Sequence, residues 1–507
     1  MIPDEYSSRL AELLDRLKAS FPDGRTPDGF NELPIPDQAL DEQLKLLIDR
    51  LASHYPFHRP EYAGQMLKPP HPAAWLAYSL AMTINPNNHA LDGGPESSEM
   101  EKEVITQLKS FAGFPDDAIG HLTSSGTIAN LEALWVAREL HPHRPVAVSG
   151  NAHYTHQRMC RLLNHPVVII PDDDDGLPDP GLLNETDTLP GTVVVTLGTT
   201  GTGRVEPLHR IMEWARRHDA RVHVDAAYGG FFHLLRDSGL LNPDPWQALA
   251  DADSLVIDPH KHGLQPYGCG SVLFRDPAVG RFYKHDSPYT YFSSDDLHLG
   301  EISLECSRAG SAAVALWFTL RLLPLIPAAK PDAADRMQPP GTAEESNSEF
   351  RTVTSSGPAD DRSASPATGQ TGPMPEFAHR LSLSLRAAQS LYSRLDSSTV
   401  FQPVMRPELD IVVFVPVTEH LHCTGVSSRS VAIFKAGMEA DPEHRLYLST
   451  LEMAADEVKR LIPGLVADSE KVTVLRTVLM KPEHFDFIPE MVRRLHRLYE
   501  VTSRRES

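Results

Sequence analysis

From about residue 97 to residue 275 the sequence repeats one pattern, a short apolar run bounded by turn-forming residues and then an amphipathic segment. Continuous apolar runs of this length are typical of strands that are covered on both faces. Amphipathic segments between them, such as Leu208–His218, complete βαβ units. The pattern therefore predicts an α/β domain with a mostly parallel sheet flanked by helices. The predicted strands are Val146–Val148, Val167–Ile170, Thr192–Leu197, Arg221–Asp225, Ser254–Ile257 and Ser271–Phe274.

The composition changes on both sides of this domain. Two helices are predicted at 3–20 and 37–54, and loops rich in Pro, His, Asn and Gly follow from Tyr55 to Pro95. A long buried helix is predicted at 301–326, after which large apolar residues almost disappear, as in flexible insertions. We therefore predict four parts: an N-terminal helical segment at 1–95, a large domain at 96–327, a flexible insertion at 328–375, and a small C-terminal α+β domain at 376–507.

The charge and the cysteine content narrow the class of protein. A formal net charge of −21 argues against nucleic acid or an anionic membrane surface as a partner. The four cysteines show no paired spacing, which fits a reducing, cytoplasmic setting and no metal site. The N-terminus is acidic and amphipathic, unlike a signal peptide, and no apolar run approaches the roughly 20 residues of a membrane span.

Two of the predicted strands end in residues that are suited to chemistry. The strand Arg221–Asp225 ends in Asp225, and Ser254–Ile257 is followed by Asp258, His260 and Lys261. Ligands of open α/β sheets bind at the carboxyl ends of the strands, so these side chains should face one crevice. A carboxylate and an amine together suggest pyridoxal 5'-phosphate (PLP), with Lys261 as the Schiff-base lysine. Taken alone, Asp225 could be a helix cap and Lys261 a surface lysine.

A small polar turn precedes the amphipathic helix that begins near residue 126. Ser125 and Thr127 offer hydroxyls, and Gly126 permits close approach of the backbone, as a phosphate at a helix N-terminus requires. The same residues would also form an ordinary N-cap. PLP further needs a carboxylate beside the pyridine nitrogen, for which we expect Asp225. Ala227 is small enough to lie against the ring, and His153 could stack on it.

The order of these features along the chain resembles one family, the PLP-dependent group II amino acid decarboxylases. That family includes aromatic amino acid, glutamate, tyrosine and aspartate decarboxylases of the aspartate-aminotransferase fold (fold type I). The resemblance covers about residues 85–320. It is carried by TSSGTIANLEAL, AHYTH, LGTTGTGRVEP, HVDAAYGG and DPHKHG, and less strongly by ECSRAG.

The resemblance implies a role for each matching residue. Lys261 would bind the cofactor covalently, Asp225 would pair with the pyridine nitrogen, and His153 and Ala227 would lie on opposite faces of the ring. Thr200 would lie near the cofactor hydroxyl or the substrate carboxylate. The phosphate would be held by Ser125, Gly126, Thr127 and His260, with Asp258, where many relatives have Asn, contributing through its backbone.

The resemblance also implies a homodimer with the active site at the subunit interface. A tyrosine on a loop after the lysine would protonate the substrate carbon, and both Tyr289 and Tyr291 lie at a suitable distance in the sequence. Asn88 and His89 could reach a polar substrate side chain, although they could equally belong to a structural loop. Arg308 could bind a carboxylate or the C-terminal domain.

The expected activity is decarboxylation of an L-amino acid to its amine and CO2. Within PLP chemistry, an aminotransferase, an oxidative deaminase or a carbon–carbon lyase is the alternative. A nucleotide-binding oxidoreductase would need GxGxxG spacing, from which GTTGTG departs. A metalloenzyme would need a third ligand near His260 and His262, or near His153 and His156. A binding protein that had lost catalysis would not need both Lys261 and Asp225, so the presence of both residues argues against this alternative.

Overall fold

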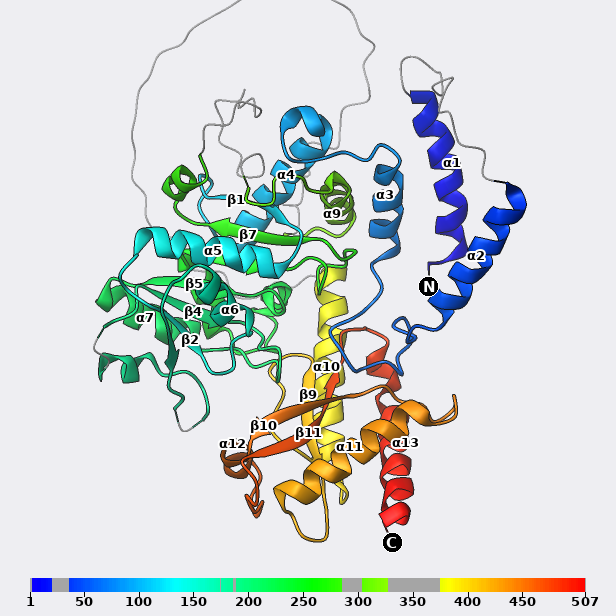
Figure 1. Ribbon diagram of the computed structural model, residues 1–507, viewed down its shortest axis with the longest axis vertical. Coiled ribbons are helices and arrows are strands. Elements are labelled where there is room, and N and C mark those ends of the chain that lie inside the picture. The colour runs from blue at the N-terminus through cyan, green and yellow to red at the C-terminus, as the bar shows by residue number, and fades with distance from the viewer. Residues whose placement is uncertain are drawn as a thin grey trace, which may run out of the picture.

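A central sheet organises the large domain. The computed structural model describes residues 2–20, 36–173, 175–185, 188–284, 303–326 and 374–506, shown in Figure 1. In this part of the chain the sheet has seven strands in the order β1-β7-β6-β5-β4-β2-β3. They are β1 (Ile119–Thr123), β2 (Val146–Ser149), β3 (Val167–Ile170), β4 (Thr192–Thr196), β5 (Arg221–Asp225), β6 (Ser254–Ile257) and β7 (Gly270–Phe274).

The direction of the strands brings several chain segments to one edge of this sheet. Strands β2 to β6 pair in parallel, whereas β7 lies antiparallel between β6 and β1. Because β7 runs antiparallel to both neighbours, β1 and β6 have the same direction. Thr123 of β1 pairs with Gly270 of β7, and Ile257 of β6 pairs with Ser271 of β7. The carboxyl ends of β1, β2, β4, β5 and β6 therefore meet at the same edge, where a ligand site is expected.

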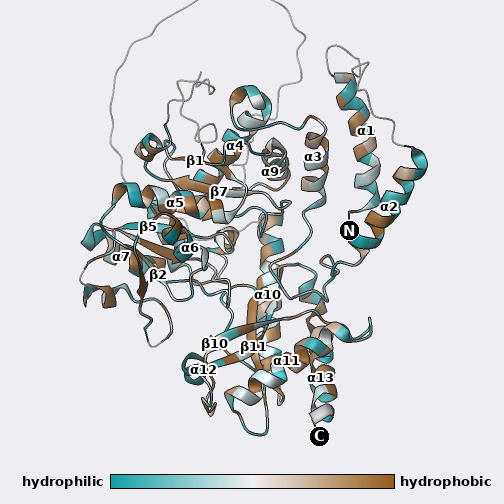
Figure 2. Cartoon of the chain, viewed as in Figure 1, coloured by the Kyte–Doolittle hydropathy of each residue, from teal (hydrophilic) through white to brown (hydrophobic). Residues whose placement is uncertain are grey.

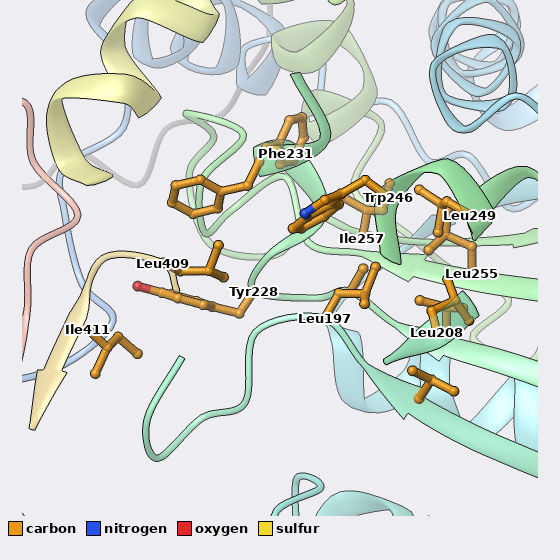
Figure 3. Close-up of a cluster of buried hydrophobic side chains, with 14 of the residues drawn as sticks. Leu197, Leu208, Tyr228, Phe231, Trp246, Leu249, Leu255, Ile257, Leu409 and Ile411 are labelled. Carbon is orange, nitrogen blue, oxygen red and sulfur yellow. The ribbon is translucent and has the colours of Figure 1, made fainter. Parts of the chain in front are cut away.

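Helices cover both faces of the sheet, and its core is apolar. These helices are α4 (Pro95–Ala112), α5 (Gly126–Leu140), α6 (Thr155–Leu162), α7 (Leu208–His218), α8 (Asp244–Gln247) and α9 (Gly310–Leu322). Figure 3 shows how Trp246, Leu255 and Ile257 fill the space beside the sheet, while Leu409 and Ile411 extend the cluster toward the C-terminal sheet. The two sheets therefore share one hydrophobic core.

The C-terminal part is a four-stranded antiparallel sheet in the order β10-β11-β9-β8. Its strands are β8 (Phe401–Pro403), β9 (Ile411–Pro416), β10 (Ser449–Ala454) and β11 (Lys471–Val478), and its helices are α10 (Glu376–Asp396), α11 (Cys423–Glu439), α12 (Ala455–Leu461) and α13 (His484–Glu506). Short 3-10 helices lie at Leu91–Gly93, Pro180–Glu185, Gly230–Leu235, Ala248–Asp251 and Pro277–Phe282.

The N-terminal helices lie at one side of the molecule (Figure 1). They are α1 (Asp4–Ser20), α2 (Asp37–Ala52) and α3 (Pro72–Met82), and α1 packs against α3. Helix α2 buries none of its residues. In Figure 2 its surface carries hydrophobic as well as polar residues. No helix in the described residues is long and apolar enough to cross a membrane.

The fold class and most element positions predicted from sequence are confirmed. Helix α7 and strands β3, β5 and β6 have the predicted bounds. The prediction of a helix over 301–326 is wrong at its start, because residues 303–309 form turns and α9 begins only at Gly310. The loop predicted from Tyr55 to Pro95 contains α3, whose Pro72 occupies the first turn, where proline is tolerated. The four-part domain division stays a prediction.

Asp410 links the C-terminal sheet to the loop that carries Lys261. Its carboxylate, fully buried just before β9, accepts a hydrogen bond of 2.6 Å from the Tyr228 hydroxyl through Oδ1. Its Oδ2 lies 3.2 Å from Nε2 of His262, the residue after Lys261. Burial opposes ionisation of Asp410, but His262 and the hydroxyl of Tyr228 hold its pKa below the usual range. Buried polar groups joined in this way depend strongly on one another.

We expect Asp410→Ala to lower the free energy of unfolding by about 3 kcal/mol, because it leaves Tyr228 and His262 buried without their partner. Asp410→Asn should lower it less, since the amide oxygen still accepts from Tyr228. Urea unfolding followed by circular dichroism measures both, with the exposed Asp441→Ala as the matched control. Equal losses in Asp410→Ala and Asp441→Ala would contradict this role.

Candidate active site

A cavity of about 270 Å³ lies at the sheet edge where the strands end. It combines residues from β4, β5 and the segments that follow β1, β2, β4, β5 and β6, so positions up to 136 residues apart in the chain share it (Ser125 to Lys261). Its lining consists of Ser125, Gly126, Thr127, Asn130, His153, Tyr154, Thr155, Thr196, Gly198, Thr200, Asp225, Ala227, Tyr228, Asp258, His260 and Lys261. All the residues expected at the cofactor therefore meet here.

Asp225 forms one end of this cavity. Strand β5 delivers its carboxylate into a site where the side chain is 6% exposed. Its Oδ2 accepts a 2.8 Å hydrogen bond from Nε2 of His156 on α6, and its Oδ1 accepts one of 3.1 Å from the backbone N–H of Ala227. An ionised carboxylate can only accept, so Nε2 of His156 carries the proton.

These contacts keep the Asp225 carboxylate ionised. Burial alone would raise its pKa, but the hydrogen bond and the charge interaction with His156, the ammonium of Lys261 and the Ala227 N–H together hold the pKa well below its usual range. A permanently ionised carboxylate at this position can stabilise a positive charge beside it. The geometry therefore provides what a protonated pyridine nitrogen needs.

Lys261 and Asp258 form an ion pair at another part of the wall. The Nζ of Lys261 lies 3.3 Å from Oδ2 of Asp258, and Nε2 of His260 lies 3.6 Å from the same oxygen. His260 is oriented by a 2.6 Å hydrogen bond between its Nδ1 and the carbonyl of Cys269. The Asp258 carboxylate, 2% exposed, thus lies beside both Lys261 and His260.

Two glycines allow the turn before α5 to approach this carboxylate closely. A Cβ at Gly126 would lie 2.4 Å from Oδ2 of Asp258, and a Cβ at Gly270 would lie 2.6 Å from Oγ1 of Thr123. Ser125 caps α5 by accepting a hydrogen bond from the Ile128 N–H at 3.4 Å. The capping role considered from sequence is therefore present, and the α5 N-terminus still faces the cavity as an anion site would.

His153, Ala227 and Thr200 also line the cavity. Burial lowers the pKa of His153, and the charge of Lys261 lowers it further against the opposing effect of Asp225, which favours a neutral ring. A neutral aromatic ring is suited to stacking on a flat cofactor. The carbonyl of Thr200 accepts a 2.6 Å hydrogen bond from Nη2 of Arg476 on β11, so the C-terminal sheet supports this loop.

The other residues expected at the site lie elsewhere or outside the described residues. Asn88, His89 and Arg308 do not line the cavity. The Nδ2 of Asn88 donates to Glu101 Oε2 at 2.7 Å, and Nη1 of Arg308 donates to Glu101 Oε1 at 2.8 Å. Asn88 and Arg308 thus both donate hydrogen bonds to the Glu101 carboxylate, which is a structural role. Tyr289 and Tyr291 fall in 285–302, outside the described residues.

Sequence reasoning missed the residues that support the site from behind. His156 follows His153 by three positions, the spacing of neighbours on one helical face, and this signal could have indicated it. Asn130 donates to the carbonyl of Gly126 at 2.8 Å and is joined to Nε2 of His223 at 2.8 Å. Burial lowers the pKa of His223 to about 3, so this histidine is neutral.

The cavity fits PLP on its own chemistry. A helix N-terminus with flanking hydroxyls suits a phosphate, the ionised Asp225 suits a pyridinium, and Lys261 offers an amine between them. Moreover, Oγ1 of Thr196 and Oδ1 of Asp258 are buried without hydrogen-bond partners among the described residues. Such orphaned polar atoms in a cavity are expected where a ligand completes the hydrogen bonds.

Comparison with known structures gives the fold class. The chain superimposes on a crystal structure of "Oryza sativa TDC with PLP and tryptamine" with a TM-score of 0.70 at 17% identity, covering 98% of this chain and 95% of that one. At this identity the match establishes the fold, which is that of the fold type I PLP-dependent decarboxylases.

Residues 25–325 match the pyridoxal-dependent decarboxylase conserved domain. The chain therefore belongs to this family of PLP-dependent proteins. An L-tyrosine decarboxylase of Enterococcus faecium is 27% identical over 406 residues, 60% of this chain and 66% of that protein. A probable L-tyrosine/L-aspartate decarboxylase of Methanothermobacter thermautotrophicus is 30% identical over 265 residues, 51% of this chain and 70% of that protein. The alignments span about two thirds of these relatives.

A buried acid, Glu206, lies behind the cavity wall. Its Oε2 accepts from the backbone N–H of Thr196 at 2.6 Å, and its Oε1 bonds the hydroxyl of Ser149. Burial raises the pKa of the Glu206 carboxyl from 4.5 to about 7, even though both hydrogen bonds act in the opposite direction. The folded protein therefore holds a proton here that the unfolded chain has released at neutral pH.

This raised pKa predicts the sign of a pH effect. The stability that the bound proton contributes is complete below pH 4.5 and is lost as the pH rises through about 7. Glu206→Gln should therefore gain about 1–3 kcal/mol relative to the wild type between pH 5 and pH 8. Urea unfolding at both pH values measures the difference. Glu213→Gln, on the exposed face of α7, is the control, and parallel curves for wild type and Glu206→Gln would refute the assignment.

Proposed function

We propose that this chain is a carboxy-lyase that uses PLP to convert an L-amino acid to its amine and CO2. The observation that carries the proposal is the shared cavity in which Asp225, Lys261 and the N-terminus of α5 meet. Family membership supports the same reaction. The names of the relatives include tyrosine, aspartate and 2,4-diaminobutyrate, so they cover aromatic, acidic and basic substrate side chains.

In this proposal Lys261 binds the cofactor covalently and Asp225 pairs with its ring nitrogen. Ser125, Gly126, Thr127 and His260 hold the phosphate. When bound, the cofactor would supply an electron sink for the pair that stays on the substrate carbon as CO2 leaves. Support for these roles is the position of each group in the cavity wall.

The protein's own groups orient the reactants and manage protons. The neutral His153 ring and the small Ala227 side chain offer surfaces for the two faces of the cofactor ring. Asp258 Oδ2 pairs with the Lys261 ammonium at 3.3 Å and lies 3.6 Å from Nε2 of His260. Thr196 Oγ1 and Thr200 offer hydroxyls to polar atoms of the ligand. Tyr289 or Tyr291 is the proposed proton donor to the substrate carbon, as predicted from sequence.

Lys261→Ala should abolish CO2 release and remove the yellow colour of the cofactor-loaded protein, because no other amine in the cavity wall can replace Nζ. The measurement is CO2 release across the twenty amino acids, with product analysis that separates an amine from a keto acid or aldehyde. Lys284→Ala, in the same domain but outside the cavity, is the control. Normal turnover by Lys261→Ala would end the proposal, and a keto acid product would favour an aminotransferase or deaminase.

We further propose a homodimer whose interface includes α2. Five apolar side chains at helical spacing on α2 are between 43% and 64% exposed, which are Leu40, Leu44, Leu47, Ile48 and Leu51. A stripe of this kind needs a partner surface. An apolar groove between α1, α3 and α9 offers such a surface in a second copy.

The four cysteines are all free of disulfide bonds, which supports the predicted cytoplasmic setting.

Leu47→Glu should convert the dimer to a monomer, because it places a charge at the centre of the apolar stripe. Light scattering coupled to size exclusion measures the mass. Leu46→Glu is a closely matched control: Leu46 is 52% exposed against 51% for Leu47, but it lies on the opposite side of α2. A wild-type monomer, or dissociation by both substitutions alike, would contradict an interface at this stripe.

A further inference from the structure

A second cavity, of about 400 Å³, lies between the N-terminal segment and the C-terminal part of the chain. Its walls come from the start of α1, the segment before α3, the residues after Lys261, helix α10, and the turn before α13. It shares no lining residue with the cofactor cavity. The proposed reaction therefore leaves this cavity unexplained.

The polar lining of this second cavity is strongly basic. Its cationic side chains are Lys68, Lys481 and Arg380, and Arg380 also pairs with Glu376 on α10 at 2.9 Å. The lining also contains His58, His71 and His262, whose pKa values are lowered by burial, and one carboxylate, the exposed Glu483. In a chain with a net charge of −21, such a concentration of basic groups is unusual. Low-dielectric walls focus the field of clustered charges, so the cavity should attract anions.

The two lysines of this lining have no carboxylate partner among the described residues. Lys481 is 4% exposed, and its ammonium donates to the carbonyl of Tyr62 at 2.6 Å. That bond uses one of its three protons. Neither Lys481 nor the half-buried Lys68 lies within ion-pair distance of a carboxylate in the described part of the chain. Buried ammonium groups are normally paired, so these two indicate a missing anion.

The electrostatics agree with this geometry. Burial lowers the pKa of Lys68 to about 8, and the nearby Arg380 lowers it further, against the opposing effect of Asp410. Burial lowers the pKa of Lys481 to about 7, with an added contribution from Lys68. Each cation thus makes its neighbours harder to protonate. A bound anion would restore both ammonium groups.

We propose that this cavity is a binding site for a compact phosphate-class anion, either inorganic phosphate or the phosphate group of a small metabolite, held by Lys68, Lys481 and Arg380. Several cations that converge on one space match an ion with more than one negative charge, which a phosphate carries near neutral pH. Lysine binds phosphate as a point charge, and arginine adds directed hydrogen bonds. The volume accommodates a phosphate with part of a small organic molecule.

The site borders the polar chain that links the two cavities. His262 lines the basic cavity and Tyr228 lines the cofactor cavity. Asp410 accepts a hydrogen bond from Tyr228 and lies 3.2 Å from Nε2 of His262. An anion beside Lys68 would therefore lie on the far side of a buried network from Lys261. The assignment of the anion site itself does not depend on the decarboxylase reaction.

The test is a calorimetric titration of the cofactor-loaded protein with inorganic phosphate at constant ionic strength. The bound cofactor occupies its own phosphate subsite, so the titration reports the second cavity. Wild-type protein should bind one phosphate per chain in a saturable manner. Lys68→Gln and Arg380→Gln should each weaken binding about tenfold, the loss expected for one charged hydrogen bond. A second titration with glucose 6-phosphate distinguishes the two ligands. Tighter binding of glucose 6-phosphate than of inorganic phosphate indicates that the site takes an organic phosphate.

The matched control is Lys471→Gln, which removes the same charge from an exposed ion pair on β11 and should leave phosphate affinity unchanged. No saturable phosphate binding by the wild type, or binding by Lys68→Gln and Arg380→Gln as tight as that of the wild type, would overturn the assignment. Malonate binding more tightly than either phosphate would overturn the phosphate class. Since the readout is binding, failure here leaves the proposed reaction untouched, and an inactive enzyme can still bind phosphate.

Discussion

The buried carboxylate of Asp225 is the constraint on which the cofactor site depends. In a site with little water, a carboxylate stays ionised only if donors and cations replace the lost hydration. Here His156 Nε2 and the Ala227 N–H fill that need at 2.8 and 3.1 Å. Helix α6 must therefore lie where His156 reaches the end of β5. The position of an entire helix is tied to the charge of one side chain.

A second polar cluster of the cavity surrounds Lys261. Asp258, His260 and the N-terminus of α5 gather there because Gly126 and Gly270 let three backbone segments approach within contact of a carboxylate. A cavity with a fixed anion at one end and an anion-attracting helix terminus at another suits a ligand with a cationic ring and an anionic tail. The arrangement orients such a ligand before any chemistry occurs.

The C-terminal sheet completes both cavities. Arg476 on β11 donates to the carbonyls of Thr200 and Gly201, and Asp410 bonds Tyr228 and faces His262. These contacts are buried, so they are strong only while the two sheets stay packed through their common core. The basic cavity is built from the same packing, since its walls come from both ends of the chain. One interface thus supports a cofactor site and a separate basic pocket.

The sequence by itself determined the α/β class, the strands and the residues at the cofactor cavity, because apolar runs and the chemistry at their ends are local signals. It did not reveal His156, Asn130 or Asp410, whose roles depend on partners 69 to 182 positions away. Nor did it reveal that α9 starts only at Gly310 or that Arg308 bonds Glu101. Only the tertiary structure decided these points, because burial and long-range hydrogen bonds choose among conformations that local sequence allows equally.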